Sequence, residues 1–448
     1  MAMIEKTDAP VVIRGGRPVP AEMPDNSARE KTIAYRILRR HDSSGGGRDM
    51  HLRFDALISH DITYVGIIQT ARASGLKAFP LPYALTNCHN SLCAVGGTIN
   101  EDDHVFGLSA AKKYGGIYVP ANQAVIHQFA REKLASCGSM ILGSDSHTRY
   151  GCYGALGVGE GGGELVKQLL KNTYDIASPE VVLVWVTGSV PHGIGPHDVA
   201  LALVSETFPQ GFVKNKILEF AGPGIAGLSM DFRIGVDVMT TETSCLSSIW
   251  ETDESVKAWY ENIGRAGDYA SQRIEEGACY DAMVTVNLEE MESMIALPFH
   301  PSKAYTIHEL QANAEEILRE TQEECSRTLS GKVQLDLCRN IGADGKIHVS
   351  QGVIVGCSGG MYDNLSEAAD ILKGQSISNG EFDLSVYPAS APVNLAAVRD
   401  GLAEELLEAG AVLKPCFCGP CFGAGDTPAN NTLSIRHATR NFPNREGS

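Results

Sequence analysis

Short apolar runs that alternate with helical patterns constrain this chain more than any other feature of its sequence. Five runs are typical of buried strands: 139–143, 180–187, 283–286, 352–356 and 382–387. Five stretches have the apolar spacing of helices: 123–136, 163–174, 198–208, 308–320 and 393–409. Alternation of this kind predicts an α/β protein with helices layered on largely parallel sheets. Functional side chains are then expected at strand ends.

The length of the chain leaves room for several cores. Its 448 residues suggest two to four domains at the usual ~150 residues each. Stretches that contain proline and glycine at 191–196 and 297–301 are plausible joints. They predict three α/β domains, at 1–190, 191–300 and 301–448.

Composition excludes several classes of function. A net charge of −17 argues against a nucleic-acid surface, where a basic patch is expected. No window approaches the ~20 apolar residues of a membrane span, and residues 1–20 contain no apolar signal core. The twelve cysteines then indicate a reducing compartment, and we expect a cytoplasmic protein.

Three cysteines stand where a metal centre would need them. Cys357 follows the strand-like run 352–356, and Cys418 and Cys421 form a Cys-Gly-Pro-Cys turn. Three thiolates can hold a four-iron cluster by three corners and leave the fourth iron open as a Lewis acid. The same residues, with Cys416 as a fourth ligand, are equally suited to a structural zinc ion. The cysteines alone leave both alternatives open.

A polar turn and a glycine-rich stretch follow the strand-like run 139–143. The turn contains Asp145, Ser146 and His147, a carboxylate, a hydroxyl and an imidazole at a strand tip, although polar turns of this composition are common. The stretch 157–163 formally contains G-x-G-x-x-G. A dinucleotide site requires these glycines directly after a strand, and here the preceding run ends too far upstream.

Other candidate residues are scattered along the chain. His89 is expected in a loop, His127 at the start of a helix, and Glu242 among hydroxyl side chains. Each of them is commonly a structural or solvated residue. Arg440 and Arg445 lie near the C-terminus, where arginines can bind carboxylates through two hydrogen bonds or simply form a solvated basic tail.

The order and spacing of these motifs resemble those of the aconitase and isopropylmalate dehydratase family. The resemblance runs from about residue 50 to the end. It rests on the run Asp145-Ser146-His147-Thr148, the pair His127-Gln128, Cys357, the run Cys418-Gly419-Pro420-Cys421, the run Arg440-Asn441-Phe442, and Arg445.

The resemblance implies an aconitase-like fold, with three-layer α/β/α domains around a shared cleft. It implies a 4Fe-4S cluster held by Cys357, Cys418 and Cys421, which favours the cluster over zinc. The activity implied is that of a hydro-lyase acting on a small hydroxy-polycarboxylic acid. The resemblance implies that His147 is the acid, with Asp145 setting its tautomer, and that His89 is the next candidate acid. Glu242 and His127 are then supporting residues. The substrate-binding residues that it implies are Ser146, Arg440 and Arg445.

The chain also departs from the family pattern. Cys88-His89 replaces the usual Asp-His, Cys357-Ser358-Gly359 replaces Cys-Thr-Asn, and Thr439 replaces an asparagine. These changes place it nearest to a divergent hydratase branch. The family's swivel domain, which supplies the base, is absent, so we expect either a separate swivel subunit or a truncated chain. Alternative functions are the large subunit of an isopropylmalate-type dehydratase and a non-catalytic iron- or redox-sensing homologue.

Overall fold

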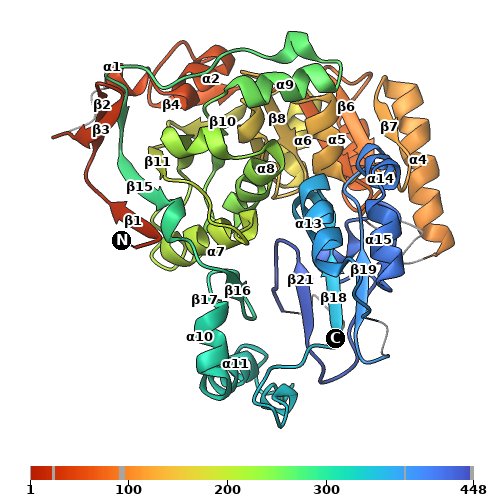
Figure 1. Ribbon diagram of the computed structural model, residues 1–448. Helices are drawn as coiled ribbons and strands as arrows, with labels where there is room; N and C mark the ends of the chain where they lie inside the picture. The colour runs from red at the N-terminus through yellow and green to blue at the C-terminus, as the bar shows by residue number, and fades with distance from the viewer. Residues whose placement is uncertain (1, 23–25, 90–95, 378–379, 444–448) are drawn as a thin grey trace. The chain divides into compact units, whose positions relative to one another are not determined.

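The computed structural model describes residues 2–22, 26–89, 96–377 and 380–443. They form a mixed α/β protein with mostly parallel sheets (Figure 1). The chain divides into two compact units. Unit 1 comprises Met1–Thr86, Asp102–Val119 and Ile126–Met291, and unit 2 comprises Asn87–Glu101, Pro120–Val125 and Glu292–Ser448. The three-domain division expected from the sequence stays a prediction.

Unit 1 contains two five-stranded sheets. The first has the order β7-β6-β5-β8-β9, and all its strands are parallel. Its strands are β5 (Ala56–His60), β6 (Tyr83–Thr86), β7 (Ile117–Val119), β8 (Met140–Gly143) and β9 (Leu156–Gly159). Every residue of β5, β6 and β8 is buried, as expected of a parallel sheet covered on both faces.

The second sheet of unit 1 has the order β1-β15-β11-β12-β13 and is parallel except for β1. Its strands are β1 (Ile4–Thr7), β11 (Val181–Thr187), β12 (Ile217–Ala221), β13 (Ser247–Trp250) and β15 (Ala282–Asn287). Smaller antiparallel pairings join β2 (Val11–Arg14) to β3 (Arg17–Pro20) and β14 (Cys279–Tyr280), and β4 (Asp49–Leu52) to β10 (Tyr174–Ala177).

Some helices of unit 1 begin at recognisable caps. Asp253 accepts hydrogen bonds from the amides of Ser255 and Val256 at the start of α9, and Pro196 opens α7. The helices are α1 (Asn26–Arg29), α2 (Ile33–His41), α3 (Tyr64–Ala73), most of α4 (Thr98–Tyr114), α5 (Ile126–Lys133), α6 (Gly162–Leu169), α7 (Pro196–Thr207), α8 (Met230–Met239) and α9 (Glu254–Asn262).

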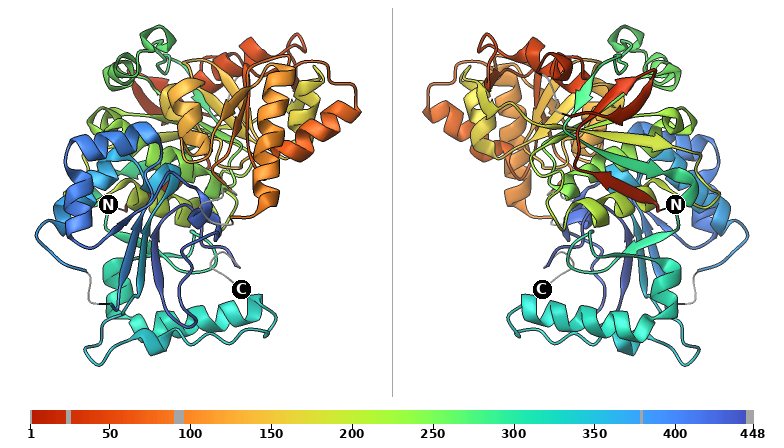
Figure 2. Two further views of the ribbon diagram at one scale, coloured as in Figure 1. Left: turned by 90° about the vertical axis from the view of Figure 1, so that its right-hand side faces the viewer. Right: turned by 90° about the vertical axis from the view of Figure 1, so that its left-hand side faces the viewer.

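Unit 2 is built on a four-stranded parallel sheet with the order β20-β19-β18-β21. Its strands are β18 (Gln351–Ile354), β19 (Asp383–Val386), β20 (Val412–Leu413) and β21 (Ser434–His437). A core that includes Leu365, Val386 and Leu406 packs helices α13 (Tyr362–Leu372), α14 (Ala391–Arg399) and α15 (Leu402–Glu408) onto one face of it, as the blue ribbons of Figure 2 show.

A smaller part of unit 2 lies between Glu292 and β18. It contains the antiparallel pair β16 (Met294–Ala296) and β17 (Ala304–Thr306), followed by α10 (Ile307–Ala312) and α11 (Ala314–Thr328). Thr306 caps α10 by accepting a hydrogen bond from the amide of Glu309, whose carboxylate accepts one from the amide of Thr306.

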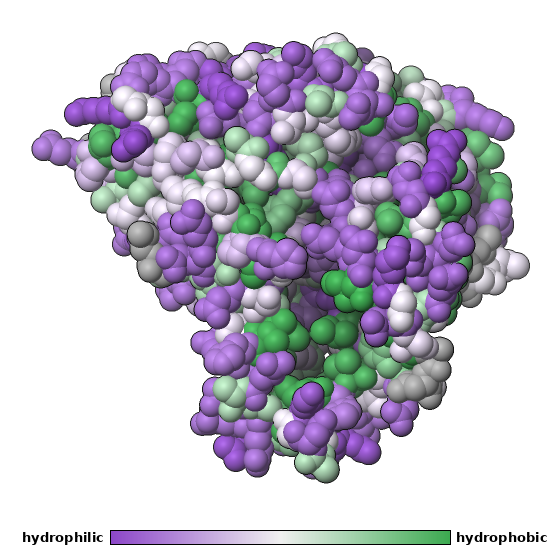
Figure 3. Space-filling view, in the orientation of Figure 1, coloured by the Kyte–Doolittle hydropathy of each residue, from purple (hydrophilic) through white to green (hydrophobic). Residues whose placement is uncertain are grey.

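Hydrophilic side chains cover most of the face shown in Figure 3. Within the described residues, no helix has both the length and the apolar character that crossing a membrane requires.

Candidate functional site

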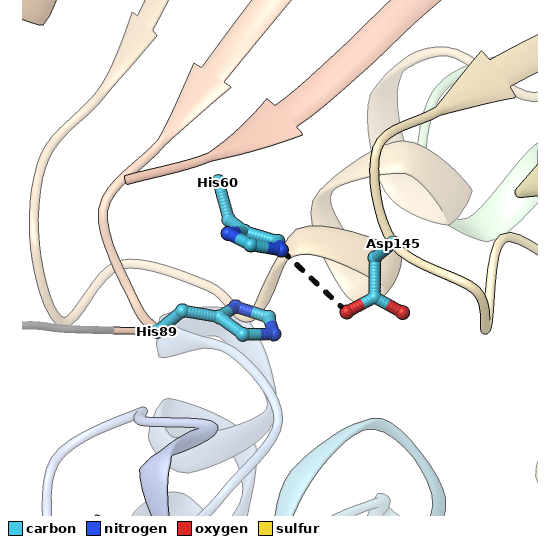
Figure 4. Close-up of side chains that lie close together, drawn as sticks. All are labelled: His60, His89 and Asp145. Atoms are coloured by element: carbon cyan, nitrogen blue, oxygen red, sulfur yellow. Dashed lines mark ion pairs between the residues drawn. The ribbon is translucent and has the colours of Figure 1, made fainter. Parts of the chain in front are cut away.

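The sheet of unit 1 brings two polar strand ends to one edge. Strands β5 and β8 are parallel neighbours, with Ile58 opposite Gly143. His60 is the last residue of β5, and Asp145 follows β8 by two residues. Their side chains therefore meet, with Nε2 of His60 3.7 Å from Oδ2 of Asp145 (Figure 4).

Asp145 is the centre of a cluster of histidines in unit 1. Its Oδ1 lies 3.0 Å from Nε2 of His127 and 3.4 Å from Nδ1 of His147. The backbone amide of His147 also donates to this oxygen at 2.7 Å. Together with His60, three imidazoles therefore surround one carboxylate. We call His60, His127, Asp145, His147 and Glu242 the acid–base cluster.

Glu242 contacts His147 more closely than Asp145 does. The distance from Nε2 of His147 to Oε1 of Glu242 is 2.6 Å, and both side chains are buried. Glu242 lies in a short 3-10 helix, Thr240–Thr243, at the end of α8. Thr241 of the same helix donates to the carbonyl of Ser146 at 2.8 Å, which fixes the Glu242 segment against the turn.

His127 has the environment of a neutral imidazole. It lies at the start of α5 and is 2% exposed, and burial lowers its pKa to about 4. The hydrogen on Nε2 is then donated to Asp145, and Nδ1 accepts a hydrogen bond from the hydroxyl of Tyr150 at 3.3 Å. At neutral pH His127 is therefore a positioned donor rather than a cation.

The glycine-rich stretch has a packing role next to this cluster. Gly157 and Gly159 lie inside β9, not after a strand as a dinucleotide site would require. A Cβ atom on Gly159 would lie 2.4 Å from the carbonyl oxygen of Asp145, and one on Gly157 would lie 2.7 Å from that of Thr148. The glycines therefore let β9 approach the turn that carries Asp145 and His147.

The sheet of unit 2 positions the cysteines. Cys357 follows β18 in the short helix α12 (Gly356–Gly359), and Cys418 and Cys421 lie at the 3-10 helix Gly419–Phe422. All three thiols are buried and free of disulfides. A Cβ atom on Gly356, whose φ is +78°, would lie 2.7 Å from Sγ of Cys421. Glycine at this position lets the sulfur of Cys421 approach the turn that carries Cys357.

Two further candidates also lie in unit 2. The ring of His89 stacks on Phe422, with ring centroids 5.5 Å apart, and the carbonyl of Cys88 accepts the amide of Cys418 at 2.8 Å. The guanidinium of Arg440 lies over the ring of Phe442 at 5.2 Å. Arg445 lies outside the described residues.

Ser146 presents an exposed side chain at the tip of its turn in unit 1. His60 was missed by the sequence reasoning. The available signal was its position just after the apolar run 56–58, but only the pairing of β5 with β8 shows that it faces Asp145.

A family model described as the aconitase family (aconitate hydratase) matches residues 33–448. The chain belongs to the aconitase family. The resemblance stated from the motifs is thus confirmed, and with it the α/β fold. The family is one of hydro-lyases, enzymes that remove or add water.

Individual relatives are distant in sequence. A 3-isopropylmalate dehydratase large subunit 2 from Archaeoglobus fulgidus is 27% identical over 350 residues, which are 78% of this chain and 76% of the relative. A mitochondrial aconitate hydratase from Gracilaria gracilis is 28% identical over 77% of this chain, but the match covers 43% of that relative. A structural comparison with the crystal structure of aconitase X from Thermococcus kodakaraensis gives a TM-score of 0.45 at 12% sequence identity. The match covers 89% of this chain and 89% of that chain.

Proposed function

We propose that the chain is an iron–sulfur hydro-lyase acting on a small hydroxy-polycarboxylic acid. The match to the aconitase family over residues 33–448 is the observation that carries the proposal. The acid–base cluster of unit 1 and the buried cysteines of unit 2 support it. They are the two kinds of group that removal of water from a hydroxy acid needs.

The cysteines suit a cluster better than a single zinc ion. Ligands of one tetrahedral zinc lie about 3.8 Å apart, given a Zn–S distance of ~2.3 Å. Among the described His, Cys, Asp and Glu residues, no group of three ligand atoms within 4.8 Å of one another includes a cysteine sulfur. The sulfurs therefore lack the close spacing of a zinc site, and the family match is what favours the cluster.

We propose that Cys357, Cys418 and Cys421 hold a 4Fe-4S cluster. When bound by three thiolates, such a cluster supplies a Lewis acid that stabilises the negative charge on a departing hydroxyl group. Burial of all three thiols excludes bulk water from the ligands. The family shown by the match makes this the expected cofactor.

His147 is proposed as the acid that protonates the leaving hydroxyl. Its Nε2 is held 2.6 Å from Glu242 and its Nδ1 faces Asp145, so the ring is fixed from two sides. Contact with Glu242 orients the ring at Nε2. His127 donates to Asp145 and keeps that carboxylate oriented toward His147.

Substrate binding and the base complete the proposal. Arg440, Arg445 and the exposed Ser146 are proposed to bind substrate carboxylates and hydroxyls. Because a relative is named a large subunit, we propose that a second polypeptide or domain supplies the base. That relative is named a 3-isopropylmalate dehydratase, so compounds similar to 3-isopropylmalate are the first substrates to test.

A screen of hydroxy-di- and tricarboxylic acids tests this function. The chain is reconstituted anaerobically with iron and sulfide, with and without a small-subunit homologue of isopropylmalate dehydratase, and formation of a carbon–carbon double bond is followed. We expect turnover that oxidant plus chelator abolishes and that ferrous iron with thiol restores. Turnover that survives oxidant and chelator would remove the cluster from the reaction. A stable cluster without turnover on any acid would favour a sensor.

A further inference from the structure

Arg436 makes an unusual set of contacts beside the cysteines of unit 2. It lies on β21, opposite Val353 of β18, and its guanidinium is partly buried. Nη1 donates to the carbonyl of Pro420 at 2.8 Å, and Nη2 donates to the carbonyl of Asp426. These two carbonyls lie on either side of Cys421 along the chain. One side chain therefore bridges both ends of the segment that carries this cysteine.

The segment it bridges is a tightly curled loop, residues 418–426. The amide of Cys421 donates to the carbonyl of Cys418, and the amide of Ala424 donates to that of Gly419, both at 2.9 Å. Gly423 and Gly425 have φ angles of +90° and +80°, values that glycine adopts readily. These hydrogen bonds join residues that are close in sequence. The conformation of the loop therefore also depends on contacts with residues outside it.

The guanidinium is itself fixed to the sheet. Nη2 donates to Oε1 of Gln351 at 3.1 Å, and Nε donates to Oγ of Ser434 at 3.1 Å. The hydroxyl of Ser434 in turn donates to the same Gln351 oxygen at 2.8 Å. Arg436 thus connects two strands, one of which leads to Cys357, with the loop that carries Cys418 and Cys421.

We propose that Arg436 is a positioning residue that holds the 418–426 loop in the conformation needed to retain the cluster. The part of the proposal that concerns the cluster rests on the proposed function, whereas the bridging of the loop does not. A lysine offers a single point charge and cannot reach both carbonyls in the planar arrangement of a guanidinium. The proposal therefore predicts that charge alone does not replace Arg436.

The first test uses the apo form of the full chain. Cys421 is 8% exposed, so its alkylation by iodoacetamide requires the loop to open. Both Arg436→Gln and Arg436→Lys should speed this alkylation ~10-fold or more, since losing a hydrogen bond from a charged donor is worth about a factor of ten. Arg399→Gln, an exposed arginine of the same unit, should not. Mass spectrometry reads each cysteine separately.

Cys325, buried in α11 of the same unit, is the internal reference. A parallel rise in its alkylation would mean general loosening and would overturn the loop-specific role, as would unchanged alkylation of Cys421. If Cys421 is alkylated at the wild-type rate in Arg436→Lys, the two-carbonyl bridge made by the guanidinium is not what holds the loop.

The second test measures loss of iron from the reconstituted protein to a chelator. Both Arg436 variants should lose iron ~10–100-fold faster than the wild type, the usual effect of removing an outer contact of a metal site. Equal rates would overturn the proposal that Arg436 retains the cluster. If the wild-type chain takes up no iron, the proposed function fails, and the alkylation rates still decide whether Arg436 holds the loop.

Discussion

At the scale of single residues, the acid–base cluster is a set of short-range contacts around Asp145. Four of its five members were candidates from the sequence: Asp145, His127 and His147 belong to motifs that the resemblance covers, and Glu242 stood out as an acid among hydroxyl side chains. The sequence did not predict His60, because only the register of β5 against β8 places that side chain 3.7 Å from Asp145. It also did not show that Glu242 is the nearest acid to His147.

Replacement of His147 tests its role as the acid. His147→Asn should lower the turnover number of the complete enzyme by roughly 10²–10⁴-fold, the usual contribution of a positioned general acid. Iron and sulfide content should not change, because no cluster ligand is altered. His192→Asn, an exposed histidine of unit 1, is the matched control and should keep its turnover. Near-wild-type turnover in His147→Asn would assign the proton to another residue.

The low pKa of His127 makes folding stability depend on pH. Burial lowers its folded pKa to about 4, below the ordinary value of 6.5. The unfolded chain then binds a proton more readily, so stability falls as pH drops from about 6.5 to about 4. The full loss from this residue is about 3 kcal/mol.

Urea unfolding of wild type and His127→Asn at pH 7 and pH 4.5 measures this effect. The variant should lose less of its unfolding free energy on acidification than the wild type does. His51→Asn is a control of opposite sign, because Asp175 raises the pKa of the exposed His51. Equal acid loss in wild type and His127→Asn would contradict the account.

At the scale of elements, the strand predictions were confirmed and the helix ends were less accurate. Each of the five predicted strands has a counterpart, because continuous apolar runs mark strands that are buried on both faces. The helix predicted over 393–409 is two helices, because Gly401 has a φ of +82° and ends the first. That predicted over 308–320 is interrupted at Asn313. Neither break changes the apolar periodicity.

The contact between β9 and the turn of Asp145 predicts the effect of adding a methyl group. Gly159→Ala should lower the free energy of unfolding by about 1–3 kcal/mol, because its Cβ would meet backbone atoms of Asp145 and Ser146 that have no room to yield. It should also lower turnover by displacing Asp145. Denaturant unfolding and steady-state kinetics measure the two effects.

Gly163→Ala is the matched control for Gly159→Ala. Gly163 lies in α6, and a Cβ atom there would have no neighbour within 4 Å. Because alanine favours helix more than glycine does, this variant should keep or slightly raise stability. Equal losses in the two variants would show that the close approach at Gly159 is not the cause.

At the scale of the whole molecule, the match over residues 33–448 shows that the chain belongs to the aconitase family. The order of the motifs along the sequence made this family predictable. The spacing of Cys357, Cys418 and Cys421 is a pattern that helix and strand periodicity alone does not produce. The division into three domains stays a prediction, as do the roles assigned to individual site residues. Two departures from the family pattern lie beside proposed site residues: the carbonyl of Cys88 accepts the amide of Cys418, and Thr439 precedes Arg440. Which hydroxy acid is the substrate is therefore a question for experiment.

A second polypeptide or domain is expected to be needed for turnover. The 448-residue chain by itself should bind iron and sulfide yet show little dehydration, because the base is expected from that partner. Addition of a small-subunit homologue of isopropylmalate dehydratase should raise turnover. If the chain alone reaches ordinary enzymic rates of ~1–10³ per second, the base must be one of its own residues.

The measurement that tests the central claim most directly is the iron and sulfide content of cysteine variants after anaerobic reconstitution. The wild type should hold about four iron and four sulfide per chain with a broad visible absorbance, and Cys357→Ser, Cys418→Ser and Cys421→Ser should each lose both. Cys416→Ser should keep them, because this account gives Cys416 no part in ligation. A chain that binds zinc without sulfide, or a Cys416→Ser variant as depleted as Cys357→Ser, would contradict the three-cysteine cluster.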